Sequence, residues 1–73
     1  MIYKDNEQIA IELKKLILEN KTSQKKVAEK LGIKPQGLVT LFKKKHITID
    51  DVKSIIGVLG YDLDINFIKK SDD

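Results

Sequence analysis

Lysine side chains are concentrated in the middle of this 73-residue sequence. Residues 21–46 contain one acidic residue, Glu29, and eight lysines, which are Lys21, Lys25, Lys26, Lys30, Lys34, Lys43, Lys44 and Lys45. Their net charge of +7 stands between −1 for residues 1–20 and −3 for residues 47–73. A basic segment between acidic ones is typical of a surface that binds a polyanion. The alternative is a solvated lysine face that binds no ligand.

Few other side chains are spaced for catalysis or metal binding. The chain has no cysteine, and its single histidine, His46, cannot build a multi-histidine metal site. The acids Asp50, Asp51, Asp62 and Asp64 fall on an expected helix cap or strand face, and no nucleophile is paired with a base. The sequence therefore predicts a binding protein, not an enzyme, with no metal and no cofactor.

Composition predicts one compact, soluble domain over residues 1–73. The chain is 41% hydrophobic and 34% charged, which is too apolar for a disordered chain, and it lacks the long apolar runs of a membrane protein. The opening residues, MIYKDNEQ, lack the apolar segment of a secretory signal. Together with the absence of cysteine, this predicts a cytoplasmic protein.

Two amphipathic helices are predicted in the first half of the chain. In residues 6–19 the apolar side chains recur at helical spacing, at Ile9, Leu13, Leu16 and Ile17. A second helix is expected over residues 24–31, where the Ser23 hydroxyl caps the first turn and Gly32 ends the helix in a left-handed conformation. Its inward side chains are expected to be Val27, Ala28 and Leu31.

A third helix is predicted over residues 35–43, after a short turn that contains Ile33. Pro35 suits the first helical position, where no intrahelical N–H bond is lost. The buried stripe is expected at Leu38, Leu41 and Phe42. The side chains left toward solvent or a ligand are then Lys34, Gln36, Gly37, Val39, Thr40 and Lys43. Two short helices joined by a turn of about three residues form the unit that enters the major groove of DNA.

The fourth helix is predicted over residues 49–59. The Thr48 hydroxyl is placed to cap it, and Asp51 completes a capping-box pattern. Its core stripe is expected at Val52, Ile55, Ile56 and Leu59. Gly57 weakens the helix by about 1 kcal/mol relative to alanine, which predicts close packing at that position, and Gly60 ends the helix.

After Gly60 the apolar side chains alternate along the chain. Tyr61, Leu63, Ile65 and Phe67 fall on one face, and Asp62, Asp64 and Asn66 fall on the other. The alternation predicts a β-strand over residues 61–68. An otherwise helical chain offers it no sheet, so we expect antiparallel pairing with a second copy through Leu63, Ile65 and Phe67. The alternatives are pairing with residues 1–3 of the same chain and a frayed tail.

The segment SQKKVAEKLGIKPQGLVTLFKKK, residues 23–45, resembles the signature of the lambda-repressor-like or Cro-type helix-turn-helix regulators of bacteria and phages. The resemblance rests on the spacing of Gln24, Ala28, Gly32, Ile33, Leu38 and Leu41, and with the flanking helices it covers about residues 6–60. It implies a mainly α, four-helix domain that binds double-stranded DNA as a transcriptional regulator, with repression expected. A homodimer would read a palindromic operator with half-sites about 34 Å apart. The terminal strand resembles only a subset of these proteins.

The resemblance assigns DNA contacts to individual positions. Base contacts are expected from Lys34, Gln36, Gly37 and Thr40. Phosphate contacts are expected from Gln24, Lys25, Lys43, Lys44 and Lys45. Gln36 is the strongest candidate for base reading, because a glutamine amide can pair with both N6 and N7 of adenine. Lys34 could reach guanine or merely a phosphate, Thr40 could touch a base edge or stay idle, and Gln24 could be an ordinary surface residue.

The sequence departs from the family pattern on the reading helix. Pro35 stands where relatives often have a polar base-reading residue, Gly37 has no side chain, and Val39 places an apolar group on a face expected to be wet. All the basic residues are lysines, so the bidentate base contact that arginine provides is missing. We therefore expect a sparse reading surface, with a contribution from DNA shape.

A second class of function uses the same fold to bind a protein. The chain could be the antitoxin of a toxin–antitoxin pair, or an adaptor that binds a protein partner through its acidic C-terminal strand. Both functions are compatible with DNA binding.

Overall fold

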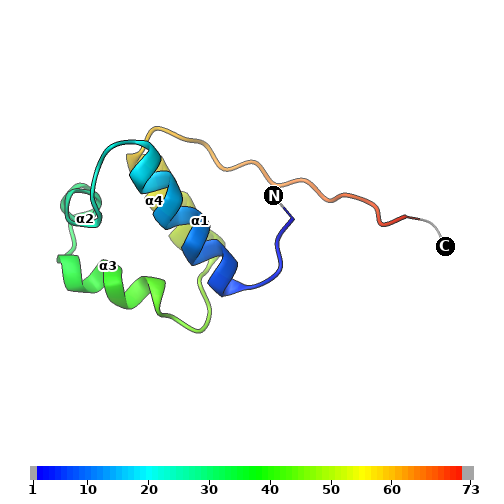
Figure 1. The fold of residues 1–73 in the computed structure, drawn as a ribbon, viewed down its shortest axis with the longest axis horizontal. Helices are drawn as coiled ribbons and strands as arrows, with labels where there is room; N and C mark the ends of the chain where they lie inside the picture. Colours follow the sequence, from blue (N-terminus) through cyan, green and yellow to red (C-terminus); the bar gives the residue numbers. More distant parts are fainter. Residues whose placement is uncertain (1, 72–73) are drawn as a thin grey trace.

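Four helices form the regular secondary structure of residues 2–71, the part of the chain that the computed structural model describes (Figure 1). They are α1 (Asn6–Glu19), α2 (Gln24–Leu31), α3 (Pro35–Phe42) and α4 (Ile49–Val58). The predicted mainly helical, four-helix fold is confirmed, with α3 and α4 each ending one residue earlier than expected. Within this part of the chain, no helix is both long enough and apolar enough to cross a lipid bilayer.

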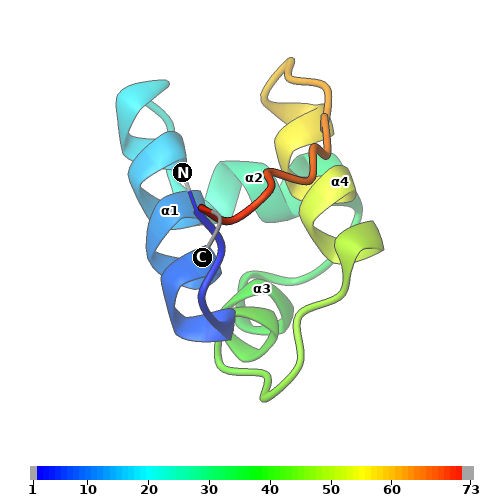
Figure 2. The same cartoon turned by 90° about the vertical axis from the view of Figure 1, so that its right-hand side faces the viewer.

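The helices are arranged around α2. In Figure 2, α1 and α4 lie on opposite sides of the molecule, with α2 and α3 between them. α2 packs on each of the other three helices, and α1 also packs on α4. α3 packs chiefly on α2, so one long side of α3 is left facing outward.

The predicted helix starts are confirmed. At α2, the Ser23 Oγ accepts a hydrogen bond from the backbone N–H of Lys26 at 3.2 Å. At α4, Thr48 and Asp51 form the reciprocal pair of a capping box. Pro35 occupies the start of α3. Each side-chain cap satisfies a backbone N–H group that the helix leaves free and contributes about 1 kcal/mol.

A left-handed residue sets the direction in which α3 leaves α2. Gly32 has φ of +77°, a conformation that glycine adopts without the steric cost of a Cβ atom. The backbone N–H of Ile33 then donates to the carbonyl oxygen of Ala28 at 3.0 Å, which closes the last turn of α2. Because the turn is short and hydrogen-bonded, the two helices are held at a fixed angle.

The core is entirely apolar. The side chains of Ile17, Val27, Leu38 and Ile55 are at most 2% exposed, and no polar or charged residue is buried in residues 2–71. The buried set is Ala10, Leu13, Ile17, Val27, Ala28, Leu38, Phe42, Ile55 and Ile56. All four helices contribute, so hydrophobic burial fixes the positions of the helices relative to one another.

The prediction of a strand over residues 61–68 is wrong for the single chain. The segment is extended, but no part of residues 2–71 forms a strand, and no backbone hydrogen bond joins residues 62–71 to another described segment. Pairing with residues 1–3 is also absent at residues 2 and 3, and Met1 lies outside the described residues. A strand requires a neighbouring hydrogen-bonded ladder, which the helical body does not supply.

The tail leaves the helical body from a fixed starting point. The backbone N–H of Tyr61 donates to the carbonyl oxygen of Ile56 at 3.0 Å, and its hydroxyl oxygen accepts from Asn20 Nδ2 at 3.1 Å. Beyond this anchor the tail runs outward (Figure 1), and the side chain of Phe67 is 97% exposed. The alternation of apolar residues thus corresponds to an extended segment that pairs with no other described segment of the chain.

The prediction of close packing at Gly57 is also wrong. This residue is exposed, and a Cβ atom built on it would contact nothing within 4 Å beyond its chain neighbours and the backbone of its own helix. The structure does not explain the choice of glycine at this position.

Truncation of Leu38 to alanine should strongly destabilise the protein. Leu38 is fully buried, so Leu38→Ala loses buried apolar surface and leaves a cavity, with an expected cost of about 2–5 kcal/mol. Leu18→Ala is the matched control, because this leucine of α1 is 73% exposed and its truncation should change stability by less than about 0.5 kcal/mol. Urea denaturation followed by circular dichroism measures both values. Equal losses for the two variants would contradict the described core.

Candidate nucleic-acid interface

The outward side of α3 carries the residues expected to contact bases. All four residues of this set are exposed, namely Lys34, Gln36, Gly37 and Thr40. Lys34 is the residue that precedes the helix, and the other three lie within it. On the other side, Leu38 and Phe42 are 0% and 7% exposed. Burial of that side leaves a ligand access to α3 only from the side of Gln36 and Thr40.

Two positions limit the number of side chains that this side of α3 offers to a ligand. Val39 is half-buried, so the expectation that it lies on the solvent-exposed face holds only in part. At Gly37, an added Cβ atom would meet only the Ile33 side chain, at 3.8 Å, which is an ordinary contact. Packing within the protein therefore does not require glycine at this position, and its absent side chain leaves the helix backbone open to a ligand.

Gln24 lies at the first position of α2, and Lys25 follows it. Gln24 is half-buried, and its side chain makes no hydrogen bond to another residue of the described chain. Lys25 is exposed next to it.

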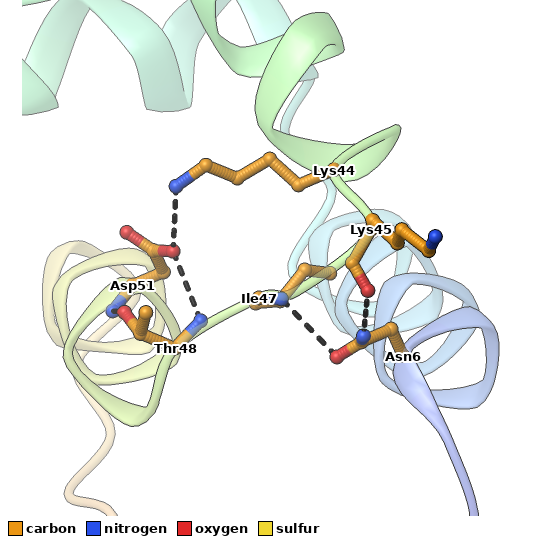
Figure 3. Close-up of polar contacts among 6 residues, drawn as sticks. All are labelled: Asn6, Lys44, Lys45, Ile47, Thr48 and Asp51. Carbon is orange, nitrogen blue, oxygen red and sulfur yellow. Dashed lines mark hydrogen bonds and ion pairs between the residues drawn. The ribbon is translucent and has the colours of Figure 1, made fainter.

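The loop between α3 and α4 holds the expected phosphate-binding lysines, and polar side chains from α1 and from α4 hold its backbone (Figure 3). From α1, the Asn6 carboxamide donates to the carbonyl oxygen of Lys45 and accepts from the backbone N–H of Ile47 at 3.1 Å. From α4, Asp51 Oδ2 accepts from the backbone N–H of Thr48 at 3.0 Å. These bonds determine how the loop backbone presents its lysine side chains.

The three loop lysines are not equivalent. Lys44 Nζ lies 3.1 Å from Asp51 Oδ2 in an ion pair, and it points back toward α4 (Figure 3). Lys43 and Lys45 are exposed and make no such pair within residues 2–71. Two of the three ammonium groups are thus free to meet an anion, while the third would have to leave a carboxylate.

Asp51 is held in its charged form by the same contacts. The hydrogen bond from the Thr48 backbone is the main cause that lowers the pKa of the Asp51 carboxyl, and partial burial opposes it. Hydrogen bonds from Lys44 and from the Thr48 side chain, together with the Lys44 charge, lower the pKa of this carboxyl further. The carboxylate therefore serves as helix cap and as counter-ion at once.

The structure adds a basic residue that the sequence pattern missed. Lys14 of α1 places its Nζ 5.6 Å from the centre of the Phe42 ring, which favours a cation–π contact. It lines a groove of about 440 Å³ together with Asn6, Glu7, Ala10, Ile11, Phe42, Lys43, Lys44 and Lys45. Positive charge thus extends from the loop onto α1. No local signal could reveal this, because Lys14 is far from the loop in sequence and lies in a segment of net negative charge.

Comparison with known proteins gives one positive result. A family model described as helix-turn-helix matches residues 13–66, which is more than half of the chain. The searches of curated proteins and of solved structures gave no match. The matched region contains the turn at Gly32, all of α3 and the lysine loop.

Neutralising Asp51 should reduce stability in a pH-dependent way. Because the folded-state pKa of this carboxyl is lowered, its charge stabilises the fold above the unfolded pKa near 3.8, and the contribution is lost as pH falls through the folded value. Asp51→Asn keeps an acceptor for the Thr48 N–H but removes the charge. At pH 7 it should lower the free energy of unfolding by about 0.5–1 kcal/mol. Denaturation at pH 7 and below pH 3 should show this difference shrinking, and a difference independent of pH would refute the assignment.

Proposed function

The chain belongs to the helix-turn-helix family of the lambda-repressor and Cro type, and on that premise we propose that it is a sequence-specific DNA-binding repressor of a prokaryote or phage. Its recognition helix is α3, which enters the major groove of double-stranded DNA in the cytoplasm. The observation that carries the proposal is the pairing of a one-sided α3, buried through Leu38 and Phe42, with an adjacent lysine loop. Repression then follows from occupancy of the DNA and requires neither catalysis nor a cofactor.

Base reading is assigned to a few side chains on α3. Gln36 is exposed near the start of the helix, and its amide suits adenine. Thr40 lies one turn further along, where a hydroxyl or methyl contact to a base edge fits. Lys34 reaches a guanine or a phosphate, and Gly37 lets the helix backbone approach the duplex closely. Because so few side chains face the bases, direct reading of the base sequence is modest, and part of the specificity comes from DNA shape.

Phosphate binding is assigned to the lysines around the reading helix. Lys43 and Lys45 are free for this role, and Lys44 joins them only by exchanging Asp51 for a phosphate. Gln24 and Lys25 contribute from the start of α2. Because these contacts release counterions from the duplex, most of the affinity should depend on salt concentration.

Base reading and phosphate binding can be separated by mutation. Gln36→Ala should weaken binding to a selected operator by about 1–3 kcal/mol and leave the salt dependence unchanged. Lys43→Ala should weaken binding to all duplexes and reduce the slope of log affinity against log salt by about 0.9. Fluorescence anisotropy with an operator selected from random DNA measures both effects. Lys53→Ala, an exposed lysine of α4 outside the basic segment, is the control and should bind as the unchanged protein does.

The proposal fails if the protein binds no duplex DNA. It also fails if its affinity is the same at low and at physiological salt.

We further propose a homodimer formed by residues 61–68, which would match a palindromic operator. Beyond Tyr61 the tail is extended, and its backbone N–H and C=O groups are unpaired within residues 2–71, as those of an edge strand are. About a two-fold axis, only registers that place odd-numbered residues opposite odd-numbered residues bring the apolar faces together. In the register centred on Asn66, Ile65 lies opposite Phe67 and Asp62 lies opposite Lys70, while Leu63 lies along the aliphatic stem of Lys69.

A charge placed on the apolar face of the tail should prevent this dimer. Phe67→Asp would put a carboxylate opposite Ile65 of the second copy, so sedimentation equilibrium should show a monomer where the unchanged protein is a dimer. Ile49→Asp is the matched control, since Ile49 is 61% exposed on α4, away from the tail, and its replacement should leave the dimer intact. A monomer for the unchanged protein, both free and on DNA, would refute the tail-mediated dimer.

The same tail supports the second candidate function, that of an antitoxin or adaptor. Phe67 and Ile68 are 97% and 72% exposed, which is a surface that a protein partner of a different kind could cover. Sedimentation as a monomer, together with a toxin-like reading frame beside the gene, would favour this function over the stand-alone repressor.

A further inference from the structure

The loop that carries Lys43, Lys44 and Lys45 is bonded to α1 and to α4, two helices that are distant from each other in sequence. Its backbone is joined to the start of α1 by both hydrogen bonds of a single side chain, that of Asn6. Like charges on three consecutive lysines repel one another, so a restraint from outside the loop favours one conformation of its backbone. Asn6 supplies that restraint from the α1 side (Figure 3).

The chemistry of Asn6 is specific to a carboxamide. The side chain accepts from the Ile47 N–H through its oxygen and donates to the Lys45 carbonyl through its nitrogen. A carboxylate at this position could accept but not donate, and an alanine could do neither. Asn6 is half-buried. Its bond to the Ile47 N–H is partly shielded from water, so water would replace that bond only in part, whereas its bond to the Lys45 carbonyl is exposed.

We propose that Asn6 is a positioning residue for DNA binding, which holds the Lys43–Lys45 loop in the conformation that meets the phosphates beside α3. This inference rests on the proposed DNA-binding function. Asn6 lines the same groove as Lys43 and Lys45, but its polar atoms are occupied by the loop backbone, so it acts through the lysines and not on the DNA. Without it, the loop must be ordered when DNA binds, and the lost freedom weakens the complex.

Asn6→Ala tests the role, with Asn20→Ala as the matched control. Both asparagines lie at an end of α1, and the side chain of each forms a hydrogen bond with a segment about 40 residues away, which for Asn20 is the Tyr61 hydroxyl at 3.1 Å. Binding to a 20-base-pair duplex is measured over a range of salt concentrations, at a temperature where circular dichroism shows both variants to be folded. Asn6→Ala should lower the affinity about three- to tenfold, the range that corresponds to ordering one long side chain, and should reduce the salt slope by about one phosphate contact.

Hydrogen exchange in the free protein provides a readout independent of DNA. The backbone N–H of Ile47 should exchange faster in Asn6→Ala than in the unchanged protein and Asn20→Ala, because its acceptor has been removed. If Asn6→Ala does not fold, Asn6→Ser replaces it. Serine is tolerated at a helix start, but its shorter side chain cannot span both partners, so the same loss of affinity is expected.

The outcomes separate the two hypotheses. Failure of the unchanged protein to bind DNA would overturn the proposed function. Normal DNA binding by the unchanged protein, with the same affinity and salt slope in Asn6→Ala, would overturn only the positioning role. An equal loss in Asn20→Ala would also overturn it, because the effect would then be a general one on the fold.

Discussion

Burial of Leu38 and Phe42 on one side of α3 is the constraint from which the rest of the surface follows. Because these side chains are almost completely enclosed, α3 cannot rotate about its axis without exposing them, and Gln36 and Thr40 must face outward. The left-handed turn at Gly32 sets the angle at which α3 leaves α2. The loop lysines follow directly from the end of α3, so their position depends on the same packing.

Features that depend on nearby residues could be predicted from the sequence. The helices, the caps at Ser23 and Thr48 and the left-handed Gly32 all follow from side-chain periodicity and from backbone chemistry within one or two turns. The tail could not be predicted in this way, because an alternating pattern specifies an extended backbone but not the partner that makes it a strand. The exposure of the predicted α3 residues follows from the same local periodicity as the helix itself.

The contacts around the lysine loop could not be predicted from local sequence patterns. Asn6 and Lys14 belong to a segment whose pattern shows only an amphipathic helix, and they reach the loop because the four helices pack together. The pairing of Lys44 with Asp51 has the same origin, since the local sequence pattern marks Asp51 as a helix cap and not as a counter-ion. The fold thus determines which lysines are free to bind an anion. A count of positive charges in the sequence overstates the number of such lysines.

In the proposed dimer, the extended tail has a consequence for how occupancy of DNA varies with the amount of protein. Residues 62–71 make no hydrogen bond to the helices, so nothing within one chain compensates the entropy of ordering them against a second copy. Association in free solution would then be weak and would depend on concentration. Two copies bound at neighbouring half-sites would hold their tails at an effective concentration on the order of millimolar. DNA would itself act as the assembly platform, and occupancy would rise more steeply than in proportion to protein concentration, so that a modest fall in synthesis could empty the site.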